Sequence, residues 1–276
     1  MSELQPLSLL YQADDLEASE LNEPLGTWYG GSLSLSGPRL VANFVATLDG
    51  VVAMPEVKDS NALISAGSVA DRFVMGLLRA YADVVLIGSG TLHGSPRTRW
   101  TPEDAYPAGR TAYDAWRHQR RLPPAPSLAV MTASGEIDVN HPAMVAGATV
   151  LTTSAGAARL QGRLPAPCAL QVLPGTRAVD ARAAVAALYR SGHQTIVSEA
   201  GPRVFGSMLG ARLVDDLFLT QSPLLAGQTA GVPRWSLVED TVLLPDLRVQ
   251  SRLGSIRRQG EHLFVQYRLD NAHEST

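Results

Sequence analysis

The sequence predicts an α/β protein with a mostly parallel central sheet, flanked by helices and closed by a C-terminal antiparallel hairpin. Three observations predict this fold class. Short apolar runs recur along the chain without alternation, which is typical of strands buried on both faces of a parallel sheet. Helical patterns lie between these runs, so that strand and helix alternate. The last segments instead alternate apolar and polar residues, as a hairpin does.

Six segments are expected to form the buried strands. The first, Leu40–Thr47, follows a turn-rich stretch, and the second, Asp83–Ile87, is an apolar run bounded by polar residues. Both have the length of ordinary strands. The other four candidates are Ser127–Met131, Thr149–Leu151, Thr195–Val197 and Leu217–Thr220.

Helices are expected between these strands. In Ser68–Arg79 apolar residues recur at i, i+4 spacing, and Ser68 with Asp71 resembles a capping box at the start. The alanine-rich segment Val179–Tyr189 is followed by Gly192, a stop signal. Apolar residues of Pro202–Leu209 fall on one stripe, which predicts a third helix.

The two ends of the chain differ from its middle. Leu247–Leu253 and His262–Leu269 are expected to pair as the hairpin, with the turn at residues 257–260. Residues 1–38 are acidic and rich in turn residues, which indicates an N-terminal arm. Residues 39–270 are then expected to form one domain.

Composition narrows the functional classes. The chain has 276 residues and a net charge of −3, so electrostatics give no reason to expect nucleic acid or an anionic membrane as partner. The single cysteine, Cys168, excludes an intramolecular disulfide, and the six histidines show no ligand pair, so no metal site is expected. The first residues do not form a signal peptide, which predicts a cytoplasmic protein.

The segment Thr195–Leu209 is expected to form a strand, a sharp turn and a helix. Gly201 permits close backbone approach, and Pro202 suits the first helical position. Free amides and the helix dipole there would favour an anion such as a pyrophosphate, with Arg203 adding a charge. A well-capped crossover without a ligand has the same pattern.

Two further turns are candidates. Gly88, Ser89, Gly90 and Thr91 follow a buried strand, where ligands of open α/β sheets usually lie, although a plain tight turn fits equally. This is neither a Rossmann fingerprint nor a P-loop. Asp49, two residues after Thr47, can accept a hydrogen bond from a substrate amine or form an Asp-Gly turn. Glu199, at the end of a buried strand, needs a partner or a ligand.

The order of these motifs resembles a known family. Residues 43–53 (NFVATLDGVVA), 71–96 and 195–227 together are similar to the reductase domain of riboflavin biosynthesis, the C-terminal half of the bifunctional deaminase-reductase. The resemblance covers roughly residues 39 to 270 and is closest to stand-alone members that lack the deaminase domain and keep an N-terminal arm.

The resemblance implies a dihydrofolate-reductase-like fold, a homodimer and NADPH as hydride donor. It implies a small heterocyclic substrate, 5-amino-6-(5-phosphoribosylamino)uracil or its diamino precursor. Asp49 and Glu199 would orient the pyrimidine, with water as a source of the proton. Matching substrate-side positions are Asp49, Leu63, Arg79, Arg99 and Glu199. Matching cofactor positions are Thr47, Gly88, Ser89, Gly90, Thr91, Thr132, Ser134, Ala200, Gly201, Pro202, Arg203, Val204 and Phe205.

The sequence departs from the family mainly on the substrate side. Residues 94–100 (GSPRTRW) lack an aspartate common in the family and carry displaced arginines, and Leu63 replaces a frequent tryptophan. Ala200 stands where the family has a first glycine, but Gly201 is kept. Two alternatives therefore stay open: dihydrofolate reductase activity, and a catalytically silent NADP-binding protein.

Overall fold

The computed structural model describes residues 4–16, 19–33, 35 and 37–271. The remaining positions of the predicted N-terminal arm lie outside the described residues. The strands are β1 Ser8–Gln12, β2 Arg39–Ala46, β3 Val51–Ala53, β4 Val84–Gly88, β5 Ser127–Thr132, β6 Thr149–Thr152, β7 Ala169–Val172, β8 Thr195–Ser198, β9 Asp216–Gln221, β10 Trp235–Ser236, β11 Ser251–Gln259 and β12 His262–Leu269.

The helices connect these strands along most of the chain. They are α1 Leu25–Tyr29, α2 Ser60–Ile64, α3 Val69–Tyr81, α4 Ser89–Gly94, α5 Pro102–Ala105, the 3₁₀ turn η1 Pro107–Gly109, α6 Arg110–Gln119, α7 Pro142–Ala146, α8 Ser154–Leu160, α9 Ala181–Arg190 and α10 Pro202–Gly210.

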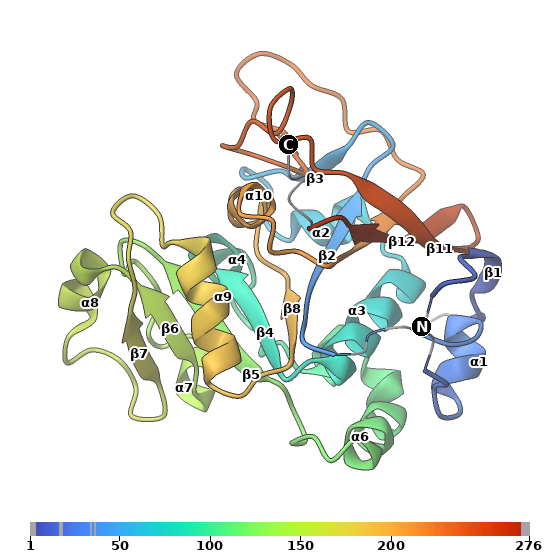
Figure 1. Ribbon diagram of the computed structural model, residues 1–276, viewed down its shortest axis with the longest axis horizontal. Helices are drawn as coiled ribbons and strands as arrows, with labels where there is room; N and C mark the ends of the chain where they lie inside the picture. Colours follow the sequence, from blue (N-terminus) through green and yellow to red (C-terminus); the bar gives the residue numbers. More distant parts are fainter. Residues whose placement is uncertain (1–3, 17–18, 34, 36, 272–276) are drawn as a thin grey trace.

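One ten-stranded sheet runs through the described residues in the order β1-β11-β12-β9-β2-β8-β4-β5-β6-β7. Figure 1 shows it extending from β7 on the left to β1 on the right. Pairing is parallel from β9 to β7 and antiparallel from β9 through β12 and β11 to β1. A mostly parallel sheet with a C-terminal hairpin is thus confirmed.

Helices cover both faces of the parallel part, because its strands are apolar on both sides. In β4, Val85 and Ile87 belong to a buried cluster with residues of α3 and α6. Val84 and Leu86 belong to a second cluster, with residues of α9 and α10. This two-sided burial explains why the strands appear in the sequence as continuous apolar runs.

Paired aspartates fix the register of the sheet centre. The Asp216 carboxylate, fully buried at the start of β9, forms an ion pair with Arg39 and accepts a hydrogen bond from Gln266 Nε2 at 2.9 Å. Asp215 accepts the backbone N–H of Leu40 at 2.8 Å. The starts of β2 and β9 and the second half of β12 are therefore held together, and the carboxyl ends of the parallel strands meet at one edge.

Helix predictions agree with the structure, whereas the hairpin boundaries do not. The predicted helices 68–79, 179–189 and 202–209 correspond to α3, α9 and α10. The hairpin turn is later than predicted: Gln259 pairs with His262 around Gly260, whose φ is +58°. A left-handed glycine suits this two-residue turn. Strand β11 therefore begins at Ser251, not at Leu247, and includes Arg257.

The N-terminal segment packs against the domain. Strand β1 pairs with β11, and Leu7, Leu25 and Tyr29 are buried in the same core cluster as α3. The Arg257 guanidinium lies 3.8 Å from the centre of the Tyr29 ring and donates to the Ser32 carbonyl oxygen at 2.9 Å. This segment thus lengthens the sheet on its antiparallel side.

Candidate functional site

The candidate residues gather at the carboxyl edge of the parallel strands. Strand β2 ends at Ala46, β4 at Gly88, β5 at Thr132 and β8 at Ser198, and all four run in the same direction. Loops that follow such strands line the crevice where ligands of α/β sheets bind. The predicted turns therefore share one side of the molecule.

Two glycine bends lie next to each other at this edge. Gly88 precedes α4, and Gly201 precedes α10, whose first residue is Pro202. A Cβ added at Gly88 would lie 3.5 Å from Val204 Cγ2 on α10. At Gly90 and Gly201 an added Cβ would meet no described atom within 4 Å. The bends are therefore adjacent, and open space lies beside both of these glycines.

Packing fixes the start of α10 in place. Phe205 packs against Phe44 of β2 with ring centres 4.9 Å apart, and its N–H makes an intrahelical bond to the Gly201 carbonyl oxygen at 3.1 Å. The amides of Arg203 and Val204 come before that bond, among the amides that a helix cannot satisfy internally. The helix dipole adds a partial positive charge there, which suits an anion.

The Arg203 side chain points to a different element. Its Nε lies 3.0 Å from Asp240 Oδ2, and its guanidinium is stacked 4.7 Å from the Trp235 ring centre. Trp235 belongs to β10, which pairs with β3. The backbone of Arg203 thus faces the bend while its charge anchors the segment around Trp235.

Thr132 and Ser134 shape the loop after β5. Thr132 Oγ1 accepts the Gly135 N–H at 3.1 Å, and Ser134 Oγ accepts the Glu136 N–H at 3.2 Å. Beside this loop lies a hollow of about 360 Å³. Its lining residues are His93, Gly135, Glu136, Ile137, Asp138, Arg159 and Arg163.

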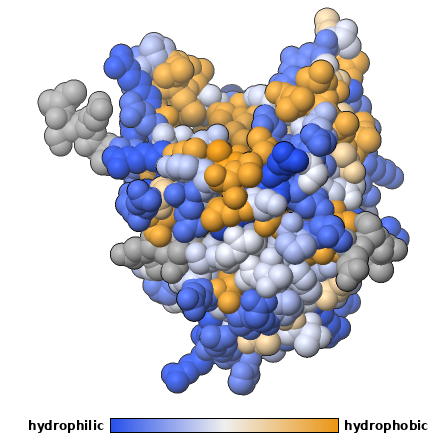
Figure 2. Space-filling model, turned by 90° about the vertical axis from the view of Figure 1, so that its right-hand side faces the viewer, coloured by the Kyte–Doolittle hydropathy of each residue, from blue (hydrophilic) through white to orange (hydrophobic). Residues whose placement is uncertain are grey.

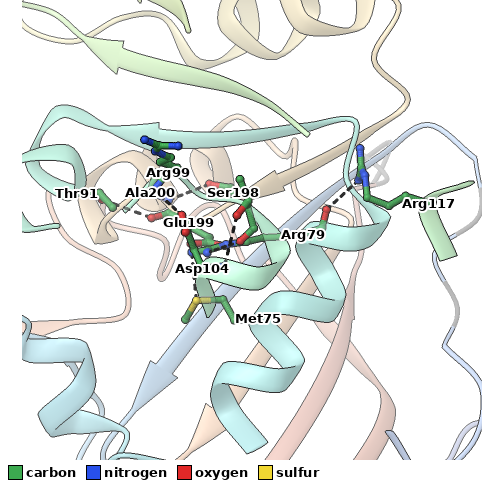
Figure 3. Close-up of polar contacts among 10 residues, drawn as sticks. Met75, Arg79, Thr91, Arg99, Asp104, Arg117, Ser198, Glu199 and Ala200 are labelled. Atoms are coloured by element: carbon green, nitrogen blue, oxygen red, sulfur yellow. Dashed lines mark hydrogen bonds and ion pairs between the residues drawn. The ribbon is translucent and has the colours of Figure 1, made fainter. Parts of the chain in front are cut away.

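A buried ion pair connects α3 with the end of β8. Arg79 donates through Nε and Nη2 to the two carboxylate oxygens of Glu199, each at 2.7 Å (Figure 3). Their side chains are 3% and 10% exposed. Arg79 also donates to the Thr101 carbonyl oxygen at 3.0 Å. Two residues predicted for the substrate side are therefore in direct contact, through a bidentate ion pair.

Thr91 brings this pair next to the glycine bends. Its hydroxyl donates to the Glu199 carbonyl oxygen at 3.4 Å, so α4 is tied to the turn after β8. In Figure 3, Thr91, Glu199 and Ala200 lie together, with Arg99 on the same side. Arg99 is exposed, and its N–H is held by Asp104 Oδ2 at 2.5 Å.

Asp49 is engaged in a separate set of bonds. Thr47 Oγ1 donates to its Oδ1 at 2.5 Å, and the N–H groups of Ala226 and Gly227 donate at 3.0 and 2.7 Å. The Thr47 hydroxyl, followed by the two amides, lowers the pKa of Asp49 to about 2. Asp49 is therefore an anion that ties the β2–β3 turn to residues 226–227. Thr47 belongs to this turn, and Leu63 on α2 is 57% exposed.

The family model of the RibD C-terminal domain matches residues 38–263. The chain belongs to this family. No functionally curated protein matches its sequence.

Solved structures show the same fold. A pyrimidine reductase-like protein from Corynebacterium diphtheriae has 18% identity and a TM-score of 0.63, over 84% of this chain and 92% of that chain. RibD from Acinetobacter baumannii (form 1) has 14% identity and a TM-score of 0.62, over 85% of this chain and 58% of that chain. The riboflavin biosynthesis reductase Rib7 from Saccharomyces cerevisiae has 13% identity and a TM-score of 0.57, over 87% of this chain and 94% of that chain. The expected α/β fold, with a mostly parallel sheet, flanking helices and a C-terminal antiparallel hairpin, is confirmed.

The sequence analysis missed Arg117, a residue that supports the helix end carrying Arg79. Buried Arg117 of α6 donates through Nη1 to the carbonyl oxygen of Arg79 at 3.1 Å (Figure 3). The same nitrogen donates to the carbonyl oxygens of Ala80 and Ala82 at 3.1 and 2.8 Å, at the end of α3. Asp83 accepts the N–H of Thr195, at the start of β8, at 2.7 Å. The end of α3, which carries Arg79, and the start of β8, the strand that precedes Glu199, are thus fixed.

A second missed residue is Asp71. The capping interaction is confirmed in one direction, since the Asp71 N–H donates to Ser68 Oγ at 3.1 Å. The Asp71 side chain, however, is buried and hydrogen-bonded to Thr220 of β9. Burial raises the pKa of Asp71 to about 6, against the opposing effect of the Thr220 hydrogen bond. The helix-start pattern hid this carboxyl, because N-terminal turns commonly carry acids.

The described residues contain no group of three or more histidine, cysteine or acidic side chains that could hold a metal ion. Nor do they contain a helix long and apolar enough to cross a membrane.

Proposed function

We propose that this RibD-family chain is an NADPH-dependent reductase of a ribosylaminopyrimidine phosphate in riboflavin biosynthesis. The substrate would be 5-amino-6-(5-phosphoribosylamino)uracil or its diamino precursor. The observation that carries the proposal is the adjacency of the Gly88 and Gly201 bends, with the Arg79–Glu199 pair joined to them through Thr91. The bends that would bind an anion and a carboxylate fixed by an arginine are thus close together.

The residues present fit a dinucleotide. Gly90 and Gly201 leave space that a side chain would fill, and the first amides of α10 would face the diphosphate of a dinucleotide. Ser89, Thr91, Ala200, Pro202, Val204 and Phe205 would line the same cradle. Thr132 and Ser134 lie at the end of β5, which is two strands from β8 in the sheet. They would contact the adenosine end of the cofactor. When bound, the cofactor supplies a hydride.

On the substrate side, the chain supplies charges that are already oriented. Glu199, held by Arg79, would orient the amino groups of the pyrimidine and stabilise positive charge that develops during reduction. Asp49 would hold residues 226–227 as a wall of the crevice. Arg99 is exposed near Thr91 and would contact the substrate phosphate, and Leu63 would cover the ring.

We also propose a cytoplasmic homodimer. Figure 2 views the molecule from the β1 side of Figure 1 and shows apolar side chains gathered on that face. On β1, Leu9, Leu10 and Tyr11 are 46%, 57% and 44% exposed. Exposed apolar groups on an edge strand favour contact with a second chain. Sedimentation of the protein and of a Leu10→Glu variant tests this, and a monomeric unaltered protein would refute it.

The deciding experiment is turnover with two substrates. NADPH oxidation is followed at saturating ribosylaminopyrimidine phosphate and, separately, at saturating dihydrofolate. The proposal expects oxidation with the first and little with the second. Oxidation with dihydrofolate alone would indicate dihydrofolate reductase activity. Tight NADPH binding without oxidation by either would indicate a silent binding protein.

A further inference from the structure

Residues 95–101, which we call the arginine loop, connect α4 with α5 and end beside the buried ion pair of the site. The carbonyl oxygen of Thr101 accepts a hydrogen bond from Arg79 Nη1 at 3.0 Å. The loop carries two exposed arginines, Arg97 and Arg99. Its conformation therefore decides where these charges lie relative to the ion pair.

The buried side chain of His141 holds the start of the arginine loop. Its Nδ1 accepts the Ala143 N–H at 3.1 Å and so caps α7. Because Nδ1 is an acceptor, the proton of the neutral imidazole lies on Nε2, which donates to the Ser95 carbonyl oxygen at 2.9 Å. His141 is 2% exposed, so this bond is shielded from water. One imidazole thus joins α7 to the first residue of the loop.

The other end of the arginine loop packs on the same imidazole. Trp100 is 2% exposed, and its ring centre lies 5.7 Å from that of His141. The φ of Trp100 is +59°, a left-handed conformation that is unfavourable for a bulky side chain. Such a conformation persists where the surrounding packing imposes it, frequently at ligand-binding sites. His141 therefore contacts the loop twice, through a hydrogen bond at Ser95 and through packing at Trp100.

Arg99 directly precedes Trp100, so this packing fixes its backbone. The Arg99 N–H donates to Asp104 Oδ2 at 2.5 Å, and its side chain is exposed. In Figure 3 it lies on the same side as Thr91 and Glu199. An exposed guanidinium on a fixed backbone is suited to bind a phosphate through paired hydrogen bonds.

We propose that His141 is a positioning residue of the arginine loop and holds Arg99 where it binds the phosphate of the substrate. This inference rests on the proposed reductase function and deepens it. His141 acts through its bond to Ser95 and its packing on Trp100, not by contact with the substrate. Its loss is expected to weaken binding of the phosphorylated substrate and to leave the hydride transfer step largely unchanged.

Two variants separate this role from the capping of α7. His141→Asn can keep the cap, since asparagine is a preferred N-cap residue, but its shorter side chain does not reach Ser95. His141→Gln can keep a donor for Ser95 and loses the acceptor for the Ala143 N–H. His141→Asn should raise the KM of the ribosylaminopyrimidine phosphate at least about tenfold, with little change in kcat or in NADPH affinity. His141→Gln should keep a KM close to that of the unaltered protein, and the reverse order would overturn the proposal.

A double-mutant cycle identifies the group through which His141 acts. Arg99→Ala should raise the same KM, and adding His141→Asn to it should cause no further increase. Arg97 lies within a turn that the Thr98 N–H closes by a bond of 3.1 Å to the Ser95 carbonyl oxygen. Arg97→Ala is the matched control on the same loop and should change KM little. Independent effects of His141→Asn and Arg99→Ala, which multiply in the double variant, would overturn the proposal.

A second measurement needs no variant. In the unaltered protein with NADP⁺, the NMR resonance of the His141 Nε2–H is recognised by its contact with the Trp100 ring. It should shift when the phosphorylated substrate binds and stay in place at saturation with the dephosphorylated substrate. An answer therefore remains even if the His141 variants do not fold. Equal shifts with both compounds, or no shift with either, would overturn the proposal.

The outcomes separate this inference from the proposed function. Turnover by the unaltered protein, with an unchanged KM in His141→Asn, overturns the positioning role alone. An unaltered protein that does not reduce the ribosylaminopyrimidine phosphate overturns the proposed function and the positioning role together. A KM raised by His141→Asn but not by His141→Gln, with no further increase in the Arg99→Ala background, supports both.

Discussion

The two halves of the proposed site differ in what they offer a ligand. Around Gly88 and Gly201 the chain presents backbone and open space, and the one nearby charge on α10, Arg203, is paired with Asp240. Around Glu199 and Asp49 it presents side chains whose polar atoms are already bonded to protein partners. The first half can accept an anion without rearrangement, whereas the second half fixes charges in advance. The proposed cofactor half would thus be determined by shape, and the proposed substrate half by electrostatics.

The largest effect is expected from breaking the fixed charge pair. Glu199→Gln leaves the Arg79 guanidinium buried without its anion, which should lower the free energy of unfolding by roughly 3–5 kcal/mol. Turnover should fall more than NADPH affinity. Denaturant unfolding and steady-state kinetics measure the two effects.

A surface ion pair provides the control for that change. Arg159 and Glu136 are 47% and 68% exposed, and Glu136→Gln should change the unfolding free energy by less than about 1 kcal/mol. Equal losses in the two variants would contradict the view that burial gives the Arg79–Glu199 pair its importance.

The next effect is a pH-dependent stability difference at Asp71. Because the pKa of Asp71 is raised from 3.8 to about 6 on folding, the native state binds more protons between these values, and stability decreases as pH rises through them. Asp71→Asn cannot ionise. Between pH 4 and pH 7 the unaltered protein should therefore lose up to roughly 3 kcal/mol relative to the variant. Urea unfolding at both pH values measures this, and a constant difference would contradict a raised pKa.

A smaller effect should sharpen the description of the cofactor half. Gly201→Val fills the space beside the bend, so NADPH should bind at least about tenfold more weakly, or 1.4 kcal/mol, while stability changes little. Fluorescence titration with NADPH gives the affinity.

Gly206→Ala, on the same helix, is the matched control. Its Cβ would lie 2.6 Å from the Glu239 carbonyl oxygen and 2.8 Å from Thr241 Oγ1, so stability should fall by about 1–3 kcal/mol. If Gly201→Val lost stability and kept its affinity, the bend would not belong to the cofactor site.

The smallest effect is expected at Asp49. Its pKa is lowered on folding, so its stabilising contribution is present above the ordinary value of 3.8 and is lost as pH falls towards 2. Asp49→Asn should weaken the protection of the Ala226 and Gly227 amides against hydrogen exchange at neutral pH. The loss of this protection at acid pH should be absent in the variant. Unchanged protection would show that other contacts hold this loop.

The sequence predicted those parts that depend on local patterns. Apolar runs and the caps at Ser68 and Gly201 identified the central strands and the helices α3, α9 and α10. The hairpin turn was predicted too early because residues 257–260 form a polar run that ends in glycine. In the structure Arg257 is buried under Tyr29, a contact more than 200 residues away in sequence.

The site followed the same rule. Each bend could be found from glycine, proline and the end of a strand, but the contact between Gly88 and Val204 depends on strand order. The Arg79–Glu199 pair joins residues that the sequence separates by 120 positions. Asp71 was overlooked because its significance comes from burial against Thr220, which a helix-start pattern cannot reveal.

The most direct test of the central claim follows backbone amides while NADPH is added. In ¹⁵N-labelled protein, the amides of residues 88–91 and 201–205 should shift together and saturate at one NADPH concentration. Such a result would show one anion site built from two adjacent bends. Shifts confined to one bend, or located away from both, would contradict the account.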